Sequence, residues 1–314
     1  MLAALGLGAW LWLRGGAARW LRPGHAAAVG RAWFVSDFED RNLLAHWRPD
    51  GPRNRTNAVR IVSSPVRAGR YAALITLYPG DRGAQKERVE LTLADEMIER
   101  EHSIPGEEAW YAWSMLVPTD FEDLPPGAFH IVGQWHPRYE PVRVRRLRRA
   151  AAAAASPQAR PPRRQIESIQ RGHARTGAPP VVLHLETRQG RRVLSLIARN
   201  DERAIGRIVG EVEVPPDRWL DLLFHIRWSM GADGLIEAWC DGRPLTAGAL
   251  HGPTVYRANG NYFRIGLYRS KGFPMRDRMF IDEFRIGPTR ASVEAPRETQ
   301  GDRHDEPARA RRAS

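Results

Sequence analysis

The sequence has very few lysines, a single cysteine and no apolar run long enough to cross a membrane. Lys86 and Lys271 are the only lysines, so nearly all basic side chains are arginines. The single cysteine, Cys240, excludes an internal disulfide and leaves the redox compartment open. The first apolar run, residues 2–13, is shorter than the roughly 20 residues that a membrane-spanning helix needs. We therefore expect no stable membrane span apart from an N-terminal anchor.

The N-terminal segment, residues 1–31, has the composition of a signal peptide. Its apolar run is followed by small residues at 26–28 that suit a cleavage site, although the arginines follow the run instead of preceding it. We expect an exported protein, periplasmic or secreted, that is either cleaved within this segment or anchored by it.

The net charge of +12 is unevenly distributed along the chain. Residues 138–178 contribute +9 and residues 1–31 contribute +4, whereas residues 291–314 are neutral overall. The remaining chain is close to neutral, so its charge does not predict the basic surface of a nucleic-acid-binding protein. We expect no nucleic acid partner, because that hypothesis depends on residues 138–178 alone.

Short strand-like runs recur between residues 33 and 287, separated by clusters of Pro, Gly, Asn and Asp. Examples are "YAALITLYP", "AWYAWSMLVP", "WLDLLFHIRWS" and "MFIDEFRIG". No long helical periodicity competes with them. Ten or more antiparallel strands in a chain of this length predict an all-β fold, a two-sheet antiparallel sandwich of the jelly-roll kind.

We expect one domain over residues 32–290, followed by a disordered tail at 291–314. A basic insertion at 138–178 interrupts the domain. It is rich in Ala, Arg and Pro and offers little to bury, so we expect it to be disordered. A partly helical segment and a basic flap over an acidic substrate are the alternatives. We expect the protein to be a monomer.

Three of the predicted strands carry a polar row opposite an apolar one, because strand side chains alternate between two faces. If the three strands are neighbours, the polar rows combine into one site on the outer face of a sheet. The polar residues are Arg88 and Glu90 in "KERVEL", Gln134 and His136 in "HIVGQWH", and Tyr262, Arg264 and Tyr268 in "NYFRIGLY".

The same three stretches resemble motifs of jelly-roll polysaccharide lyases. "RVEL", "QWH" and "YFRIGLY" are similar to the R-S-E-L, Q-I-H and Y-F-K-A-G-x-Y motifs of alginate lyases. The wider layout, from "DFED" to "FIDEFRIG", is similar to heparin lyase I and glucuronan lyases. The resemblance covers residues 33–287 apart from the insertion. It implies a concanavalin A-like jelly roll that cleaves an anionic, uronic-acid-containing polysaccharide by β-elimination.

The residue types fit the chemistry of such a lyase. The enzyme removes the C5 proton of a uronic acid, which requires that donors neutralise the neighbouring carboxylate. Arg88 and Gln134 suit this role, and His136 suits that of the base. Tyr268 matches the family's catalytic tyrosine, which protonates the leaving oxygen or acts as both base and acid. Whether His136 or Tyr268 is the base stays open.

Further residues are expected to bind the substrate. Glu90 would orient Arg88 through an ion pair. Arg264 stands where the family usually has lysine, and an arginine keeps the charge but does not transfer protons. The residues in this expected binding set are Glu90, His184, Tyr262, Arg264, Arg269 and Lys271.

Two other functions and one metal site are left open by the sequence. The same sandwich occurs as a non-catalytic carbohydrate-binding module, since fold does not fix function. A retaining glycosidase would need two carboxylates about 5–5.5 Å apart, and the sequence lacks the E-x-D-x-E run that typically supplies them. The lyase chemistry needs no cofactor. A structural Ca²⁺ is suggested where the first and last strands meet, held by Glu39 and Asp282.

Overall fold

We describe the fold from a computed structural model. It covers residues 31–52, 57–81, 86–94, 97, 100–123, 125–138, 177–201, 203–270 and 272–294. The N-terminal segment to residue 30, the insertion from 139 to 176 and the chain after 294 lie outside the described residues. The predictions made for these three segments therefore stay predictions.

The described strands form two sheets, in which all the strand pairs are antiparallel. The nine-stranded sheet contains β1 (Phe34–Ser36), β3 (Val59–Val62), β4 (Ala72–Leu77), β6 (Glu108–Leu116), β11 (Trp219–Arg227), β12 (Leu235–Cys240), β13 (Arg243–Pro244), β14 (Leu250–His251) and β16 (Asp277–Gly287). The seven-stranded sheet contains β2 (Trp47–Asp50), β5 (Lys86–Leu93), β7 (His130–Pro137), β8 (Val181–Arg188), β9 (Arg191–Ala198), β10 (Arg207–Glu213) and β15 (Asn261–Ser270).

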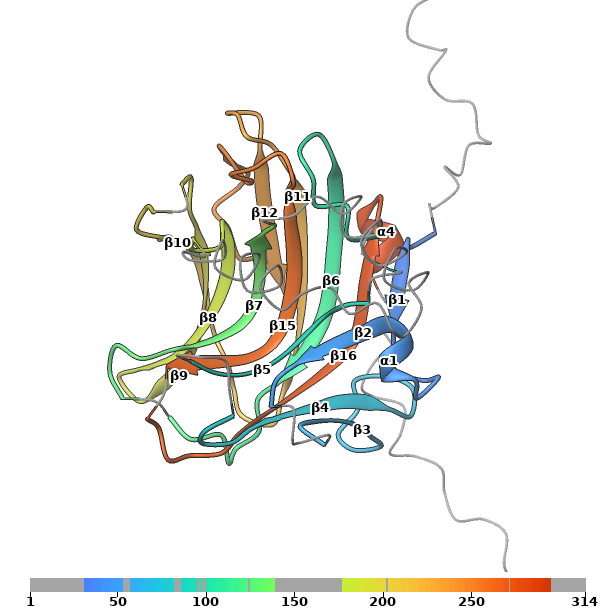
Figure 1. The fold of residues 1–314 in the computed structure, drawn as a ribbon, viewed down its shortest axis with the longest axis vertical. Coiled ribbons are helices and arrows are strands. Elements are labelled where there is room, and N and C mark those ends of the chain that lie inside the picture. The colour runs from blue at the N-terminus through green and yellow to red at the C-terminus, as the bar shows by residue number, and fades with distance from the viewer. Residues whose placement is uncertain are drawn as a thin grey trace, which may run out of the picture.

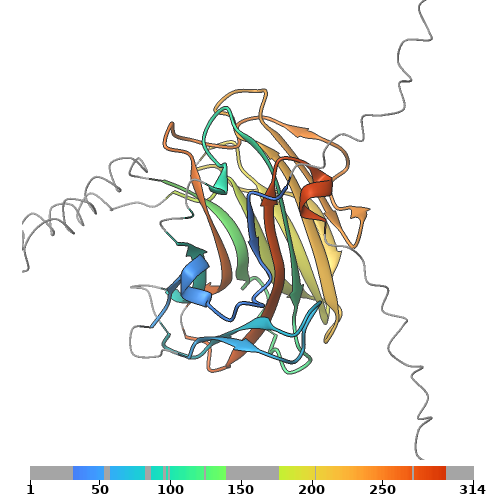
Figure 2. The ribbon, with the colours of Figure 1, turned by 90° about the vertical axis from the view of Figure 1, so that its right-hand side faces the viewer.

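The strand order shows that most neighbours are distant in sequence. The nine-stranded sheet runs β13-β12-β11-β6-β16-β4-β3, with β1 paired to β16 and β14 to β12. The seven-stranded sheet runs β10-β9-β8-β7-β15-β5-β2. The two sheets face each other as two layers (Figures 1 and 2). The all-β jelly-roll sandwich predicted from the sequence is thereby confirmed.

The core between the sheets is strongly aromatic. Trp113 of the nine-stranded sheet packs 5.3 Å from Phe263 of the seven-stranded sheet, measured between ring centroids. Trp135 lies 4.9 Å from Phe263 and 5.3 Å from Phe224 by the same measure. These side chains are at most 2% exposed. Burying large aromatic rings from both layers supplies a major part of the hydrophobic stabilisation.

Two short helices lie at the periphery of the sandwich, α1 (Leu43–His46) and α4 (Arg290–Val293) (Figure 1). Helix α4 corrects the prediction of a disordered tail from residue 291 onward. Val293 is 1% exposed because it packs on Ala112 and Leu223 of the nine-stranded sheet. The packed domain thus extends to the end of this helix.

None of the helices in the described part of the chain is long and apolar enough to span a membrane.

A buried ionic cluster occupies one end of the sandwich. Arg269 continues the inward row of β15, and its Nε donates to Glu87 Oε2 at 2.8 Å. Its Nη1 donates to Asp277, whose Oδ2 also bonds His130 Nε2 at 2.7 Å. All four side chains are buried. Asp277, His130 and Glu87 lie at the start of β16, β7 and β5, and Arg269 lies near the end of β15. These charges stay buried because each is compensated by its neighbours.

We predict that Arg269→Met lowers the free energy of unfolding by about 3–5 kcal/mol, because it removes the positive charge that joins two buried carboxylates. Urea denaturation of the purified variant measures the loss. The matched control is Arg191→Met. The side chain of Arg191 is 72% exposed and 3.5 Å from Glu213, so its loss should cost less than about 1 kcal/mol. Equal effects of the two substitutions would contradict a stabilising role for the cluster.

Candidate active site

The three strands that carry the predicted polar rows are consecutive in the seven-stranded sheet, in the order β7-β15-β5. Between β15 and β5, Tyr268 pairs with Arg88, and Gly266 pairs with Glu90. Directly paired residues of an antiparallel ladder face the same side. Arg88, Glu90 and Tyr268 therefore share one face of the sheet.

The pairing between β15 and β7 brings the other predicted residues to the same face. Arg264 pairs with Gln134, and Tyr262 pairs with His136. The prediction that these strands are neighbours and combine their polar faces is confirmed. We call this set the polar row; its members are Arg88, Glu90, Gln134, His136, Tyr262, Arg264 and Tyr268.

Glu90 lies at the bottom of the polar row, with 1% of its surface exposed. Its Oε1 accepts a hydrogen bond from Gln134 Nε2 at 2.5 Å, and its Oε2 accepts one from Arg264 Nη1 at 3.1 Å. Arg88 Nη1 lies 3.8 Å from the same Oε2. The sequence predicted only an ion pair with Arg88. The structure shows that this carboxylate holds three members of the row together.

Asp50 is a part of the site that the sequence did not reveal. It ends the edge strand β2 and pairs with Glu90 of β5. Its Oδ2 accepts from Arg264 Nη1 at 2.7 Å and from Arg88 Nη1 at 3.2 Å. Two carboxylates therefore face two guanidinium groups. The four-residue stretch "WRPD" has no alternating pattern that could have marked this aspartate.

The close approach of β5 explains why position 266, in the middle of the polar row, is a glycine. Its φ is +147°, and a Cβ at this position would lie 2.3 Å from the carbonyl oxygen of Val89 and 2.7 Å from Cα of Glu90. The bond between Glu90 and Gln134 also crosses β15, since the two residues belong to β5 and β7. A side chain at position 266 would stand beside this bond and push the two strands apart.

The two tyrosines of β15 are each packed against an arginine. The guanidinium carbon of Arg88 is 4.6 Å from the centre of the Tyr268 ring, and that of Arg264 is 5.0 Å from the centre of the Tyr262 ring. A shift in register between β15 and β7 lies between Ile265 and Tyr268, and such bulges re-aim side chains. Burial raises the pKa of Tyr268 above its ordinary value although Arg88 acts in the opposite direction. The Tyr268 phenol is therefore protonated at neutral pH.

Arg138, which follows β7, lies at the end of the polar row beside Tyr262, and its side chain is held by several contacts. It is 5% exposed, forms an ion pair with buried Glu101, and donates from Nε to the carbonyl of Asn261. Its guanidinium carbon also lies 5.7 Å from the centre of the Tyr262 ring. Arg138 thus joins the end of β7 to β15 and to the segment before β6.

His136 faces Tyr262, with 5.4 Å between the ring centroids. Burial lowers the pKa of His136 to about 4, and the nearby charges of Arg264 and Arg88 act in the same direction. The imidazole is therefore neutral at neutral pH, the form that can accept a proton.

His184 lies on β8, two strands away from Tyr268 in the same row of the sheet, because Ile131 pairs with both residues. Its ring stacks on Phe129 with 3.8 Å between centroids. Burial lowers the pKa of His184 to about 3. Stacked, buried and neutral, this histidine borders the polar row without contacting its charged members.

Two residues of the expected binding set are not brought to this face. Arg269 points inward from β15 and its side chain is 0% exposed within the ionic cluster, which corrects the expectation that it contacts substrate. Lys271 lies outside the described residues.

The carboxylates of Glu39 and Asp282 accept hydrogen bonds from backbone N–H groups, and the calcium site proposed for them stays a prediction. Asp282 Oδ2 accepts from the backbone N–H groups of Arg67 and Ala68, and its Oδ1 accepts from that of Glu283. Glu39 Oε1 likewise accepts from two backbone N–H groups, at 2.7 and 2.8 Å. Ca²⁺ needs six to eight oxygen ligands, so these two side chains would need further oxygens around the ion. The described residues contain no cluster of three or more His, Cys, Asp or Glu that could hold a metal.

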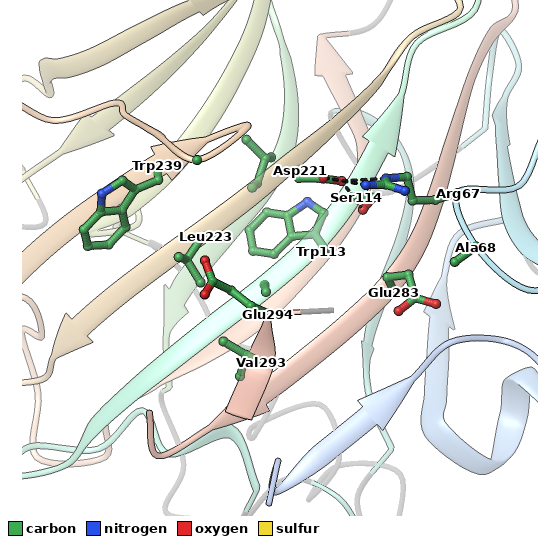
Figure 3. Close-up of a pocket in the computed structure, with 13 residues that line it drawn as sticks. Arg67, Ala68, Trp113, Ser114, Asp221, Leu223, Trp239, Glu283, Val293 and Glu294 are labelled. Carbon is green, nitrogen blue, oxygen red and sulfur yellow. Dashed lines mark hydrogen bonds and ion pairs between the residues drawn. The ribbon is translucent and has the colours of Figure 1, made fainter. Parts of the chain in front are cut away.

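A separate pocket lies on the nine-stranded sheet and contains none of the predicted site residues (Figure 3). Ala112, Leu223 and Val293 form its apolar part, with Trp239 at one side. At its polar end Arg67 binds Asp221 through two hydrogen bonds of 2.9 and 2.8 Å. Of its other charged groups, Glu283 pairs with Arg285 and Glu294 with Arg290.

The fold is a two-layer antiparallel jelly roll that carries arginines, glutamine, histidine and tyrosines on one face of one sheet. The family model described as "Polysaccharide lyase" matches residues 37–285. The chain belongs to this family, and the protein is a polysaccharide lyase.

Solved structures support the fold. An endo-β-1,4-glucuronan lyase from the fungus Trichoderma reesei is 16% identical, with 86% of this chain and 95% of that chain aligned and a TM-score of 0.51. The catalytic domain of a glycoside hydrolase family 131 protein from Coprinopsis cinerea is 10% identical, with 85% and 98% aligned and a TM-score of 0.52. Identities at this level show a shared fold. No curated protein matches the sequence.

We predict that Gly266→Ala lowers the free energy of unfolding by about 1–3 kcal/mol, through strain at positive φ and the clash with β5. Thermal and urea denaturation test this. Gly80→Ala is the matched control, because Gly80 also has a positive φ, of +82°, but nothing lies within 4 Å of its Cβ position. It should be less destabilising. If the two variants lose the same stability, the close approach of β15 to β5 is not as described.

We predict that the ring of His136 titrates near pH 4, below its ordinary value of 6.5, as burial requires. Between these two values the unfolded chain binds more protons than the folded chain at this position. His136 therefore makes the free energy of unfolding fall as the pH drops from about 6.5 to about 4. NMR titration of the imidazole, assigned with His136→Asn, measures the pKa. A midpoint at or above 6.5 would contradict the buried environment.

Proposed function

We propose that this lyase cleaves a uronic-acid-containing polymer by β-elimination at the polar row. The observation that carries the proposal is the linked cluster of Arg88, Arg264 and Gln134 around buried Glu90, with Tyr268 beside it on one side and His136 on the other. Strong donors at the centre and two proton-transfer groups at the flanks are what this elimination requires.

The central donors would act on the substrate carboxylate. The C5 proton becomes acidic only when the charge of that carboxylate is neutralised and the enolate-like intermediate is held. Arg88 offers a planar, permanently charged fork, and Gln134 adds a neutral donor. Arg264 stabilises the same charge without transferring a proton, since a guanidinium does not deprotonate in proteins. Its bonds to Glu90 and Asp50 favour this electrostatic role over that of the lysine in the resembling motif.

The protonation states of the flanking groups favour one assignment of base and acid. Neutral His136 would take the C5 proton, and the electron pair released forms the C4=C5 double bond. The bond from C4 to the leaving oxygen breaks, and Tyr268, protonated at neutral pH, would donate its proton to that oxygen. The lowered pKa of His136 and the raised pKa of Tyr268 give the protonation states that these roles require at neutral pH.

Hydrolysis is the alternative suggested by the glycoside hydrolase neighbour. A retaining glycosidase needs two carboxyl groups that both reach the sugar. In the polar row the carboxylate of Glu90 is buried beneath Arg264 and bonded to Gln134, so it cannot act as a nucleophile or proton donor to a substrate. The face therefore favours elimination. We also propose that the enzyme acts on its polymer outside the cytoplasm, as the composition of residues 1–31 suggests.

Incubation with glucuronan, alginate and glycosaminoglycans, one at a time, should give the ultraviolet absorbance of the new C4=C5 bond with at least one polymer. Reducing ends without this absorbance would indicate hydrolysis instead. Binding without either signal would favour a non-catalytic module.

On the cleaved polymer, Tyr268→Phe should lower turnover by roughly 10²-fold or more, because it removes the proton donor while keeping the ring. The melting temperature should change little. Tyr262→Phe is the matched control on the same strand and face, and its effect should be much smaller. Near-normal turnover of Tyr268→Phe would remove the tyrosine from the mechanism.

A further inference from the structure

Two permanent positive charges at the polar row are already matched by two negative ones. Arg88 and Arg264 face Glu90 and Asp50, and the neighbouring His136 is neutral at neutral pH. An incoming substrate carboxylate would therefore find the charges of these four groups already balanced. For the two arginines to bind it strongly, one of the protein's own carboxylates has to give way.

The two carboxylates differ in how firmly they are held. Glu90 is 1% exposed and is bonded by Gln134 as well as by Arg264. Asp50 lies on the edge strand β2, and 43% of its side chain is exposed. Glu90 cannot leave without exposing a buried charge, whereas Asp50 can turn into water at small cost.

The arginines would keep their positions when Asp50 turns away. Arg264 remains bonded to Glu90, and it packs on the ring of Tyr262. Arg88 remains close to Glu90 and packs on the ring of Tyr268. The position that Asp50 Oδ2 vacates lies within hydrogen-bond distance of both guanidinium groups.

We propose that Asp50 occupies, in the free enzyme, the place of the substrate carboxylate on Arg88 and Arg264. This inference deepens the proposed function and depends on it. Asp50 then sets specificity, because it competes with any incoming carboxylate. A small carboxylate that makes few other contacts is rejected, whereas a polymer that makes many further contacts displaces Asp50. Removing its charge should tighten carboxylate binding and relax this selection.

The test measures the affinity for sodium D-glucuronate by calorimetry or NMR titration at low salt. Asp50→Asn should bind it roughly three- to tenfold more tightly than the wild type, as expected for loss of a competing exposed ion pair. The gain should shrink at high salt because the contact is partly exposed. D-glucose, which has no carboxylate, should show no gain. Asp50→Glu retains the charge and should stay close to the wild type.

The matched control is Asp120→Asn. Asp120 has the same exposure, 43%, and also faces two arginines, Arg276 and Arg278. Its removal should leave glucuronate affinity unchanged. Weaker or equal glucuronate binding by Asp50→Asn, or no binding by either protein, would overturn the inference. Weaker binding would show that Asp50 positions the two arginines.

Kinetics on the cleaved polymer separate this inference from the proposed function. Asp50→Asn should lower KM with little change in kcat, whereas a holder of the arginines would lower kcat when removed. If no uronate polymer is cleaved by the wild type, the proposed function fails, but the glucuronate titration still decides whether Asp50 competes with carboxylates.

Discussion

The polar row depends on one buried carboxylate, that of Glu90. Two arginines on the neighbouring strands β15 and β5 repel each other, and Gln134 on β7, the next strand along, could point in more than one direction. A negative charge beneath them fixes all three, and the desolvation of this charge is offset only because every partner is present. The donors proposed to act on substrate are thus positioned from inside the sheet. This arrangement leaves their outer sides to meet a ligand.

The same strand serves the core and the site. In β15, Phe263, Ile265 and Leu267 pack inward among the aromatic rings, while Tyr262, Arg264 and Tyr268 point outward. A slip of one residue would bury the polar residues and expose the apolar ones. The packing of the core therefore fixes the register of the polar row, and both depend on the same strand pairing.

Alternation in the sequence was enough to predict the sandwich and the members of the polar row, because each lies within one of the long strands β5, β7 and β15. Alternation did not predict residues whose positions depend on contacts with other strands. Arg269 occupies an inward position at the end of β15, and its compensating partners Glu87 and Asp277 come from other strands. Asp50 lies on a short edge strand containing a proline, so no local pattern marks it. Val293 follows the last strand, and only the sheet beneath it shows why α4 forms there.

Arg138 has a consequence for how this protein can evolve. It is fixed to Glu101 and to the backbone of Asn261 where β7 ends, and β8 begins beside the same stretch, with Val181 paired to Trp135. The connection between these strands therefore starts and finishes at two adjacent, fixed points. The entropy of closing a loop grows only with the logarithm of its length, so this connection can lengthen or shorten with little effect on the sheet. Insertions here could add new contacts beside the polar row while leaving its strands unchanged.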